Sequence, residues 1–209
     1  MALGTGSETP LQMATANSVF ANGGYRVNPL LVTRVTDNRG HILTQNEPQL
    51  PHEANRVIDA RNAFVMNSLL QEVARSGTAA RAQATLKRPD LYGKTGTTND
   101  SLDAWFAGFN RSLVGVVWIG YDQPKKLGDR ETGGGLALPV WIDYMGTALK
   151  STPVSEMTAP EGLVNVGGEW YYEEYGPGNG IASVGLEDPP AAPPPTEEER
   201  KSILDLFKN

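Results

Sequence analysis

Three segments with strand-like sequences follow one another closely between residues 91 and 121, and they constrain the fold more than any other feature. Residues 91–98, 104–109 and 113–121 are rich in β-branched and aromatic side chains, as strands usually are. The second and third segments are joined only by Asn110-Arg111-Ser112. Parallel neighbours need a crossover of about a dozen residues or more, so the segments predict an antiparallel sheet.

Helical patterns lie before and after this sheet. Thr9-Pro10 predicts the start of a helix that Asn22-Gly23-Gly24 ends. Further helices are predicted over residues 56–76 and 139–149. In the first of these two, the residues expected to face inward are Val57, Phe64, Val65, Leu69 and Val73. The pattern predicts an α+β fold in which helices pack on the faces of an antiparallel sheet.

Two loops are expected to differ in character. Asp37-Asn38-Arg39-Gly40 separates two short apolar segments, residues 30–35 and 42–43, and is typical of a hairpin turn. Gly133-Gly134-Gly135 predicts a flexible loop, with no side chain to fix it.

The composition changes near Ser151. Downstream residues are dense in proline, glycine and acidic side chains, and they account for the net charge of -6 of the whole chain. A segment of this kind buries too little apolar surface to offset its ordering entropy. We therefore predict a folded body over residues 1–150 and a Pro-rich, acidic, largely flexible tail over residues 151–209. Within the tail, only the aromatic residues 169–172 and residues 196–207, where Thr196 could cap a short helix, have patterns that allow local order. A flexible tail is favoured over docking of residues 170–172 on the body or on a partner.

Several classes of function do not fit the composition. The chain has no cysteine, which excludes disulfides and thiolate zinc sites. It carries no pattern of a signal peptide and no apolar run long enough for a membrane anchor. A dense Lys/Arg patch with interleaved aromatic residues is missing, so nucleic acid is not an expected partner. No metal site and no cofactor are predicted.

The chemically informative stretch is residues 92–100, YGKTGTTND. In a strand, Lys94, Gly96 and Thr98 would lie on one side and Thr95 and Thr97 on the other. An ammonium group and hydroxyls suit a carboxylate, and a backbone N–H polarises a carbonyl.

Two other interpretations of this stretch fit the sequence less well or leave its role open. A phosphate-binding loop ending in Gly93-Lys94-Thr95 is excluded, because that motif needs glycine where Arg88 stands. A purely structural role stays open, since a lone Lys-Thr-Gly is short and Thr95 could simply make a cross-strand hydroxyl contact.

A longer pattern decides between these interpretations. Residues 93–100 (GKTGTTND), 103–108 (DAWFAG) and 115–122 (GVVWIGYD) resemble class A bifunctional penicillin-binding proteins of bacteria. Residues 9–11, 20–24 and 133–135 extend the resemblance, which covers about residues 2–147. It implies part of a penicillin-binding/β-lactamase-like transpeptidase fold. A serine β-lactamase is a poorer match, because the acidic tail and residues 118–141 resemble the synthase family more.

The resemblance also implies an activity and the residues that carry it. In the family, the transpeptidase domain cross-links peptidoglycan stem peptides through an acyl-serine, and β-lactams acylate the same serine. Lys94 and Thr97 would be catalytic, with Lys94 completing the proton relay and the Thr97 N–H forming half of an oxyanion hole. The substrate-binding set would be Lys94, Thr95, Gly96, Thr97 and Thr98. The family works on the periplasmic side of the cytoplasmic membrane.

One departure from the family limits this expectation. No S-x-x-K and no S-x-N occur anywhere in the sequence, so the nucleophilic serine is expected outside this chain. We expect the C-terminal portion of a D,D-transpeptidase that is inactive alone and needs its upstream segment as a partner. The alternative is a catalytically silent folding or interaction module that covers its apolar face by self-association.

Overall fold

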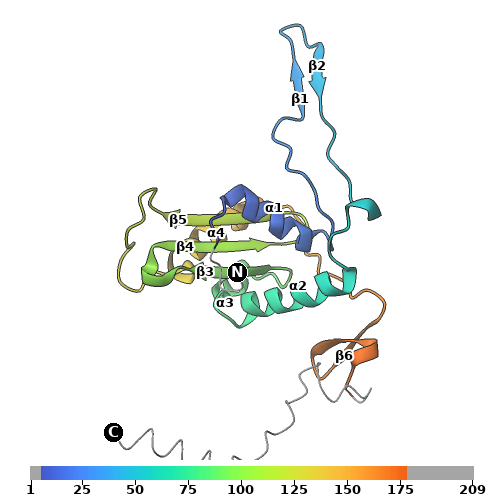
Figure 1. The fold of residues 1–209 in the computed structure, drawn as a ribbon, viewed down its shortest axis with the longest axis vertical. Coiled ribbons are helices and arrows are strands. Elements are labelled where there is room, and N and C mark those ends of the chain that lie inside the picture. The colour runs from blue at the N-terminus through green and yellow to red at the C-terminus, as the bar shows by residue number, and fades with distance from the viewer. Residues whose placement is uncertain (1–5, 178–209) are drawn as a thin grey trace, which may run out of the picture. The chain divides into compact units, whose positions relative to one another are not determined.

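The computed structural model describes residues 6–177, and the predicted antiparallel sheet lies at its centre (Figure 1). Strands β3 (Tyr92–Thr97), β4 (Asp103–Phe109) and β5 (Val114–Gly120) pair in the order β3-β4-β5, and both pairs are antiparallel. The Asn110 side chain holds the turn between β4 and β5, because its Oδ1 accepts the N–H groups of Ser112 (3.0 Å) and Leu113 (2.9 Å). The predicted α+β fold class is confirmed.

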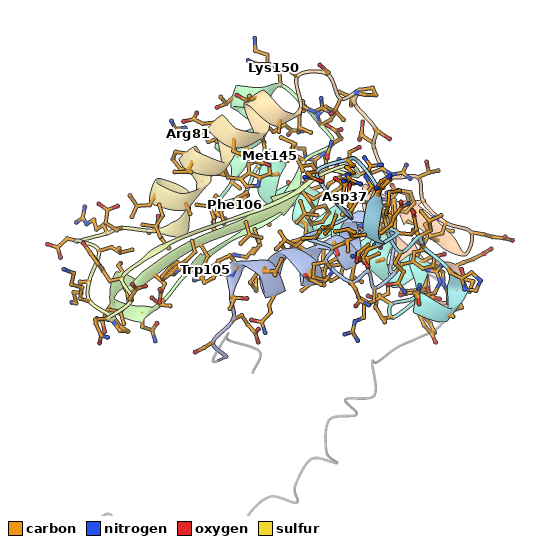
Figure 2. The ribbon with its side chains drawn as sticks, turned by 90° about the horizontal axis from the view of Figure 1, so that it is seen from above. Asp37, Arg81, Trp105, Phe106, Met145 and Lys150 are labelled. Atoms are coloured by element: carbon orange, nitrogen blue, oxygen red, sulfur yellow. The ribbon has the colours of Figure 1, made fainter. Side chains whose placement is uncertain are left out.

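Helices cover the two faces of this sheet. On one face, Phe106 packs edge-on against Trp141 of α4 (Leu138–Ala148), with the ring centroids 5.0 Å apart. Trp105 lies on the opposite face, as Figure 2 shows. That second face is covered by α1 (Pro10–Ala21), whose Ala21 joins Tyr92 and Phe109 in a buried cluster. The sheet is therefore the middle layer, and it holds its edge strands in fixed positions.

The helix termini follow their local sequence. Thr9 caps α1 in a capping box with Gln12, as Thr9-Pro10 predicts. Helix α2 (Ala60–Arg75) begins later than predicted, because the Asp59 side chain accepts the Arg61 N–H and starts the helix there. Val57 thus precedes the helix and is 56% exposed, and Leu69 is 54% exposed, so the prediction that these two face inward is wrong.

Other short helices surround the sheet. Helix α3 (Ala80–Leu86), which the sequence patterns did not predict, follows α2 directly. One-turn 3-10 helices are η1 (Glu53–Asn55), η2 (Asn99–Ser101) and η4 (Glu173–Tyr175), and a π-helical turn, η3 (Gly133–Ala137), precedes α4. Within residues 6–177, no helix has the length and apolarity to cross a membrane.

The predicted hairpin forms from β1 (Arg34–Thr36) and β2 (Ile42–Gln45), and Figure 1 shows it extending away from the sheet. Its turn is fixed by Asp37, whose Oδ1 accepts the N–H groups of Arg39 and His41, both at 2.8 Å. Every residue of both strands is exposed.

The chain after α4 differs in part from the predicted flexible tail. Residues up to Glu173 belong to the same compact unit as the body. Strands β6 (Leu163–Val166) and β7 (Glu169–Tyr172) form a hairpin, so the flexible tail favoured for residues 170–172 is wrong. Trp170 packs edge-on against Phe64 of α2 (4.9 Å), and the Ser155 N–H donates to Asp90 (3.0 Å). The helix predicted over residues 196–207 lies outside the described residues.

Candidate functional site

Strand β3 is an edge strand of the sheet, and its outer edge presents backbone groups. The Thr98 N–H donates to the Asp103 carbonyl of β4 at 3.2 Å. Backbone groups of an antiparallel strand alternate in direction, so the N–H groups of Thr95 and Thr97 point away from β4. Thr97 is exposed and Thr95 is half-buried. The outer edge of β3 therefore presents the Thr97 N–H.

The side chains of β3 alternate as predicted. Lys94 pairs with Ala107, and Thr95 pairs with Phe106 on the face that packs against α4. The Lys94 ammonium nevertheless reaches round the strand edge, where Nζ donates to the Thr95 carbonyl (2.8 Å) and lies 3.5 Å from Thr95 Oγ1. The cation thus joins the hydroxyl groups at the edge, although it starts from the opposite face.

Thr97 is held by a residue distant in sequence. Its Oγ1 accepts the Gly133 N–H at 3.0 Å. A Cβ on Gly133 would lie 2.2 Å from the Trp105 carbonyl oxygen and 2.5 Å from that of Gly96, so only glycine fits against the sheet here. An N–H can only donate, and so the Thr97 hydroxyl proton is left to point elsewhere.

The flexible loop predicted for Gly133-Gly134-Gly135 is wrong. These residues begin the π-helical turn η3, which Thr132 caps by accepting the Gly135 N–H on its Oγ1 (3.1 Å). The missing side chains let the backbone pack on β3 and β4. A run of glycines is equally typical of a close approach and of a mobile loop, so the sequence did not separate the two.

Thr95 has a partner that the sequence analysis missed. Its Oγ1 lies 2.8 Å from Oγ1 of Thr78, in the segment between α2 and α3. Ser76-Gly77-Thr78 gave no signal beyond the end of a helix. Thr98 is placed differently from the other threonines, because its Oγ1 accepts the Asp103 N–H (2.8 Å) and holds the turn into β4.

The edge is rich in hydrogen-bond donors and is open. An ammonium group, two hydroxyl groups and an outward N–H lie along Lys94, Thr95 and Thr97. Three cavities among residues 6–177 are lined by other residues, and the same part of the chain holds no cluster of three or more potential His, Cys, Asp or Glu metal ligands. Such an edge suits an extended peptide that ends in a carboxylate.

The α+β fold with a Lys-Thr-Gly edge strand is typical of one class of proteins, the penicillin-binding proteins and class A β-lactamases. The chain belongs to the penicillin-binding protein transpeptidase domain family, whose model matches residues 1–140. The resemblance to class A penicillin-binding proteins is thereby confirmed.

Similar proteins from several bacteria support the same family. The chain is 50% identical over 175 residues to penicillin-binding protein 1A of Neisseria flavescens, covering 83% of this chain and 22% of the relative. It is 43% identical over 212 residues to penicillin-binding protein 1A of Pseudomonas aeruginosa. This match covers 79% of this chain and 26% of the relative. The chain thus spans about a quarter of the length of these relatives.

Solved structures agree with the fold. Penicillin-binding protein 1A from Haemophilus influenzae superposes with a TM-score of 0.72 at 34% identity, covering 78% of this chain and 29% of that chain. Penicillin-binding protein A from M. tuberculosis, solved as an imipenem acyl-enzyme complex, gives a TM-score of 0.53 at 23% identity over 68% of this chain and 32% of that chain. This second likeness shows the fold alone.

Proposed function

We propose that this chain is the carboxylate- and oxyanion-binding portion of a peptidoglycan D,D-transpeptidase that cross-links stem peptides through an acyl-serine. The observation that carries the proposal is that one edge strand, β3, carries the Lys94 ammonium beside Thr95, the hydroxyls of Thr95 and Thr97, and the outward Thr97 N–H. Family membership supports the same function.

The binding roles follow from what each group donates. A stem peptide ending in D-Ala-D-Ala presents a carboxylate, and the Thr95 and Thr97 hydroxyls would donate to it beside the Lys94 cation. The peptide backbone would run along β3, where Thr95 and Thr97 have outward backbone groups. The Thr97 N–H would then stabilise the oxyanion that forms at the attacked carbonyl, a contribution of about 3–4 kcal/mol.

The covalent step needs a nucleophile and a base. The sequence holds neither S-x-x-K nor S-x-N, so we assign the serine and its lysine to an upstream segment of the same enzyme. The chain alone would bind the carboxylate end of a substrate or a β-lactam without being acylated. The cross-linking reaction would take place on the periplasmic side of the cytoplasmic membrane.

Penicillin labelling tests whether this chain binds the carboxylate while the upstream segment supplies the serine. This chain would be expressed alone and together with the serine-bearing part of the transpeptidase domain, and each sample would be treated with a fluorescent penicillin. We expect no label on the chain alone and label on the serine-bearing partner in the complex. Lys94→Ala should reduce the labelling rate at least tenfold, whereas Lys150→Ala, which removes an exposed ammonium elsewhere, should leave it unchanged.

Two results would count against the proposal. A covalent adduct located on this chain by mass spectrometry would place the nucleophile here. A complex that assembles by light scattering but labels equally fast with Lys94→Ala would remove Lys94 from the site.

A second candidate, an interaction module without chemistry, is favoured by the other edge of the sheet. Beside β5, an apolar groove is lined by Val116, Val117 and Trp141, and by Val140 and Tyr144, which are 50% and 55% exposed. Self-association through this face would cover it. A monodisperse monomer by light scattering at high concentration would reject self-association.

A further inference from the structure

We propose that Thr78 is a positioning residue for carboxylate recognition: its hydroxyl donates to Thr95 Oγ1 and thereby directs the Thr95 proton toward the bound carboxylate. The inference rests on the proposed function and adds a residue to it. Thr78 lies outside β3, in the segment between α2 and α3, and reaches the site through a single contact of 2.8 Å.

The number of hydroxyl protons limits which hydrogen bonds Thr95 and Thr97 can donate. Each threonine hydroxyl has one proton, and a carboxylate can only accept hydrogen bonds. At Thr97 the orientation is fixed, because Gly133 N–H donates to Oγ1 and leaves the Thr97 proton for a ligand. At Thr95 either hydroxyl of the Thr78–Thr95 pair could be the donor. If Thr95 donated to Thr78, its oxygen lone pairs would face the anion and repel it.

Lys94 does not replace Thr78 as the fixed donor to Thr95. The Lys94 ammonium donates at 2.8 Å to the Thr95 carbonyl, and its distance to Thr95 Oγ1 is 3.5 Å, at the limit of a hydrogen bond. The hydroxyl of Thr78 is the closer partner by 0.7 Å. An anion at the edge therefore selects the arrangement in which Thr78 donates and both β3 hydroxyl protons face the ligand.

The backbone around Thr78 is fixed by tight packing. A Cβ on Gly77 would lie 2.9 Å from Val73 Cα, so the chain turns closely past the end of α2. Ala79 is fully buried, and its N–H donates to the Val73 carbonyl at 3.1 Å. On the other side, a Cβ on Gly134 of η3 would lie 3.3 Å from the Thr78 carbonyl oxygen. Contacts on both sides therefore fix the backbone that carries the Thr78 side chain, and the 2.8 Å contact with Thr95 Oγ1 places its hydroxyl.

The test compares a ligand that has the carboxylate with one that lacks it. Affinities of the full chain for N-acetyl-D-Ala-D-Ala and for its C-terminal amide would be measured by NMR titration of the β3 amide signals. We expect the wild-type chain to prefer the acid. Thr78→Val, which keeps the shape and removes the hydroxyl, should lower this preference about tenfold without changing the amide affinity. Thr78→Ser should restore the preference, and Thr44→Val on the distant hairpin should leave it unchanged.

A double-mutant cycle separates positioning from direct contact. If Thr78 acts through Thr95, then Thr78→Val should have no further effect on the acid affinity of a Thr95→Val chain. The same loss in both backgrounds would mean that Thr78 binds the ligand itself and would overturn the positioning role. An unchanged preference in Thr78→Val would overturn the inference and leave the proposed function intact. A wild-type chain with no preference for the acid would overturn the proposed function and the inference together.

Discussion

The β3-β4-β5 sheet and the β1–β2 hairpin arise from the same local sequence signals but differ in burial. Each has apolar segments around a tight turn, and in each an Asx side chain holds that turn, Asn110 in the sheet and Asp37 in the hairpin. Yet β4 is buried over most of its length, whereas every residue of β1 and β2 is exposed. Local patterns thus specify strands, and only the neighbouring elements decide which strands form a core.

The difference in burial between the sheet and the hairpin should appear in how much a truncation lowers the free energy of unfolding. In the sheet, a Cβ on Gly108 would lie 2.6 Å from the Phe106 ring and 2.8 Å from the Trp141 ring, so the packing around these rings is tight. In the hairpin, Ile42 and Leu43 are 55% and 64% exposed. Burial is the main source of stability, and so the same truncation should cost far more in the sheet than in the hairpin.

The largest effect is expected for Phe106→Ala. Phe106 is fully buried, and truncation removes its ring contact with Trp141 and leaves a cavity between the sheet and α4. We expect a loss of about 3–5 kcal/mol in the free energy of unfolding. Urea unfolding followed by tryptophan fluorescence would measure it. A loss below about 1 kcal/mol would mean that this face of the sheet is not the core.

The next effect is expected at Asp90, which lies directly before the sheet and is fully buried. Arg88 donates to both of its carboxylate oxygens, at 2.9 Å and 2.7 Å. Burial raises the pKa of Asp90, but the hydrogen bonds from Arg88 and the Ser155 N–H outweigh burial and hold the pKa below its ordinary value. Asp90→Asn should lower the free energy of unfolding by about 2–3 kcal/mol.

The pH dependence of this ion pair has a definite sign. Because folding lowers the pKa of Asp90, its stabilising contribution is fully present above the ordinary aspartate pKa and is lost as the pH falls below that value and through the lowered pKa of the folded state. The urea concentrations at which the wild type and Asp90→Asn are half unfolded should therefore differ at neutral pH and become similar at acidic pH. A difference that is the same at both pH values would show that the charge is not the cause.

The parts of the fold that were predictable depend on contacts near in sequence. The Thr9 cap, the Asp37 turn and the three central strands follow from adjacent residues. Helix α3 was missed because it is a short, Ala-rich helix whose first turn has no side-chain cap. Residues 151–173 looked like a tail because the partners that order them are distant, such as Asp90, which binds Ser155 across 65 residues.

The candidate site divides in the same way. The resemblance and the alternation of β3 predicted Lys94, Thr95 and Thr97 together, because these residues are adjacent in the chain. The groups that orient the hydroxyls are not adjacent: Thr78 lies 17 residues from Thr95, and Gly133 lies 36 residues from Thr97. No local pattern specifies such contacts, so only the packed structure identifies them.

A smaller effect is expected at the base of the hairpin, where Glu53 is held by Arg56 and Tyr25. Hydrogen bonds from Arg56 and Tyr25 lower the pKa of Glu53 from 4.5 to about 2. The stabilisation is therefore present above pH 4.5 and is lost as the pH falls toward 2. Hydrogen exchange, corrected for its intrinsic pH dependence, should speed up in that window at Arg26 N–H, which donates to Asn55 (2.8 Å), and not at β4 amides.

Glu53→Gln is the matched control for this effect. It should remove the acid-induced step and leave Arg26 exchange fast at every pH. If the β4 amides lose protection together with Arg26, then the hairpin base and the sheet open as one unit, and the contrast between the two regions does not hold.

The smallest effect is expected for Ile42→Ala in the hairpin. More than half of this side chain already contacts solvent, so truncation should change the free energy of unfolding by about 0.5 kcal/mol or less. The urea assay used for Phe106→Ala measures both variants on one scale. A loss above about 1.5 kcal/mol would mean that the hairpin is covered in solution. Repeating the measurement at several protein concentrations then shows what buries the hairpin. If a second copy buries it, the loss of stability in Ile42→Ala depends on protein concentration, whereas burial within one chain gives the same loss at every concentration.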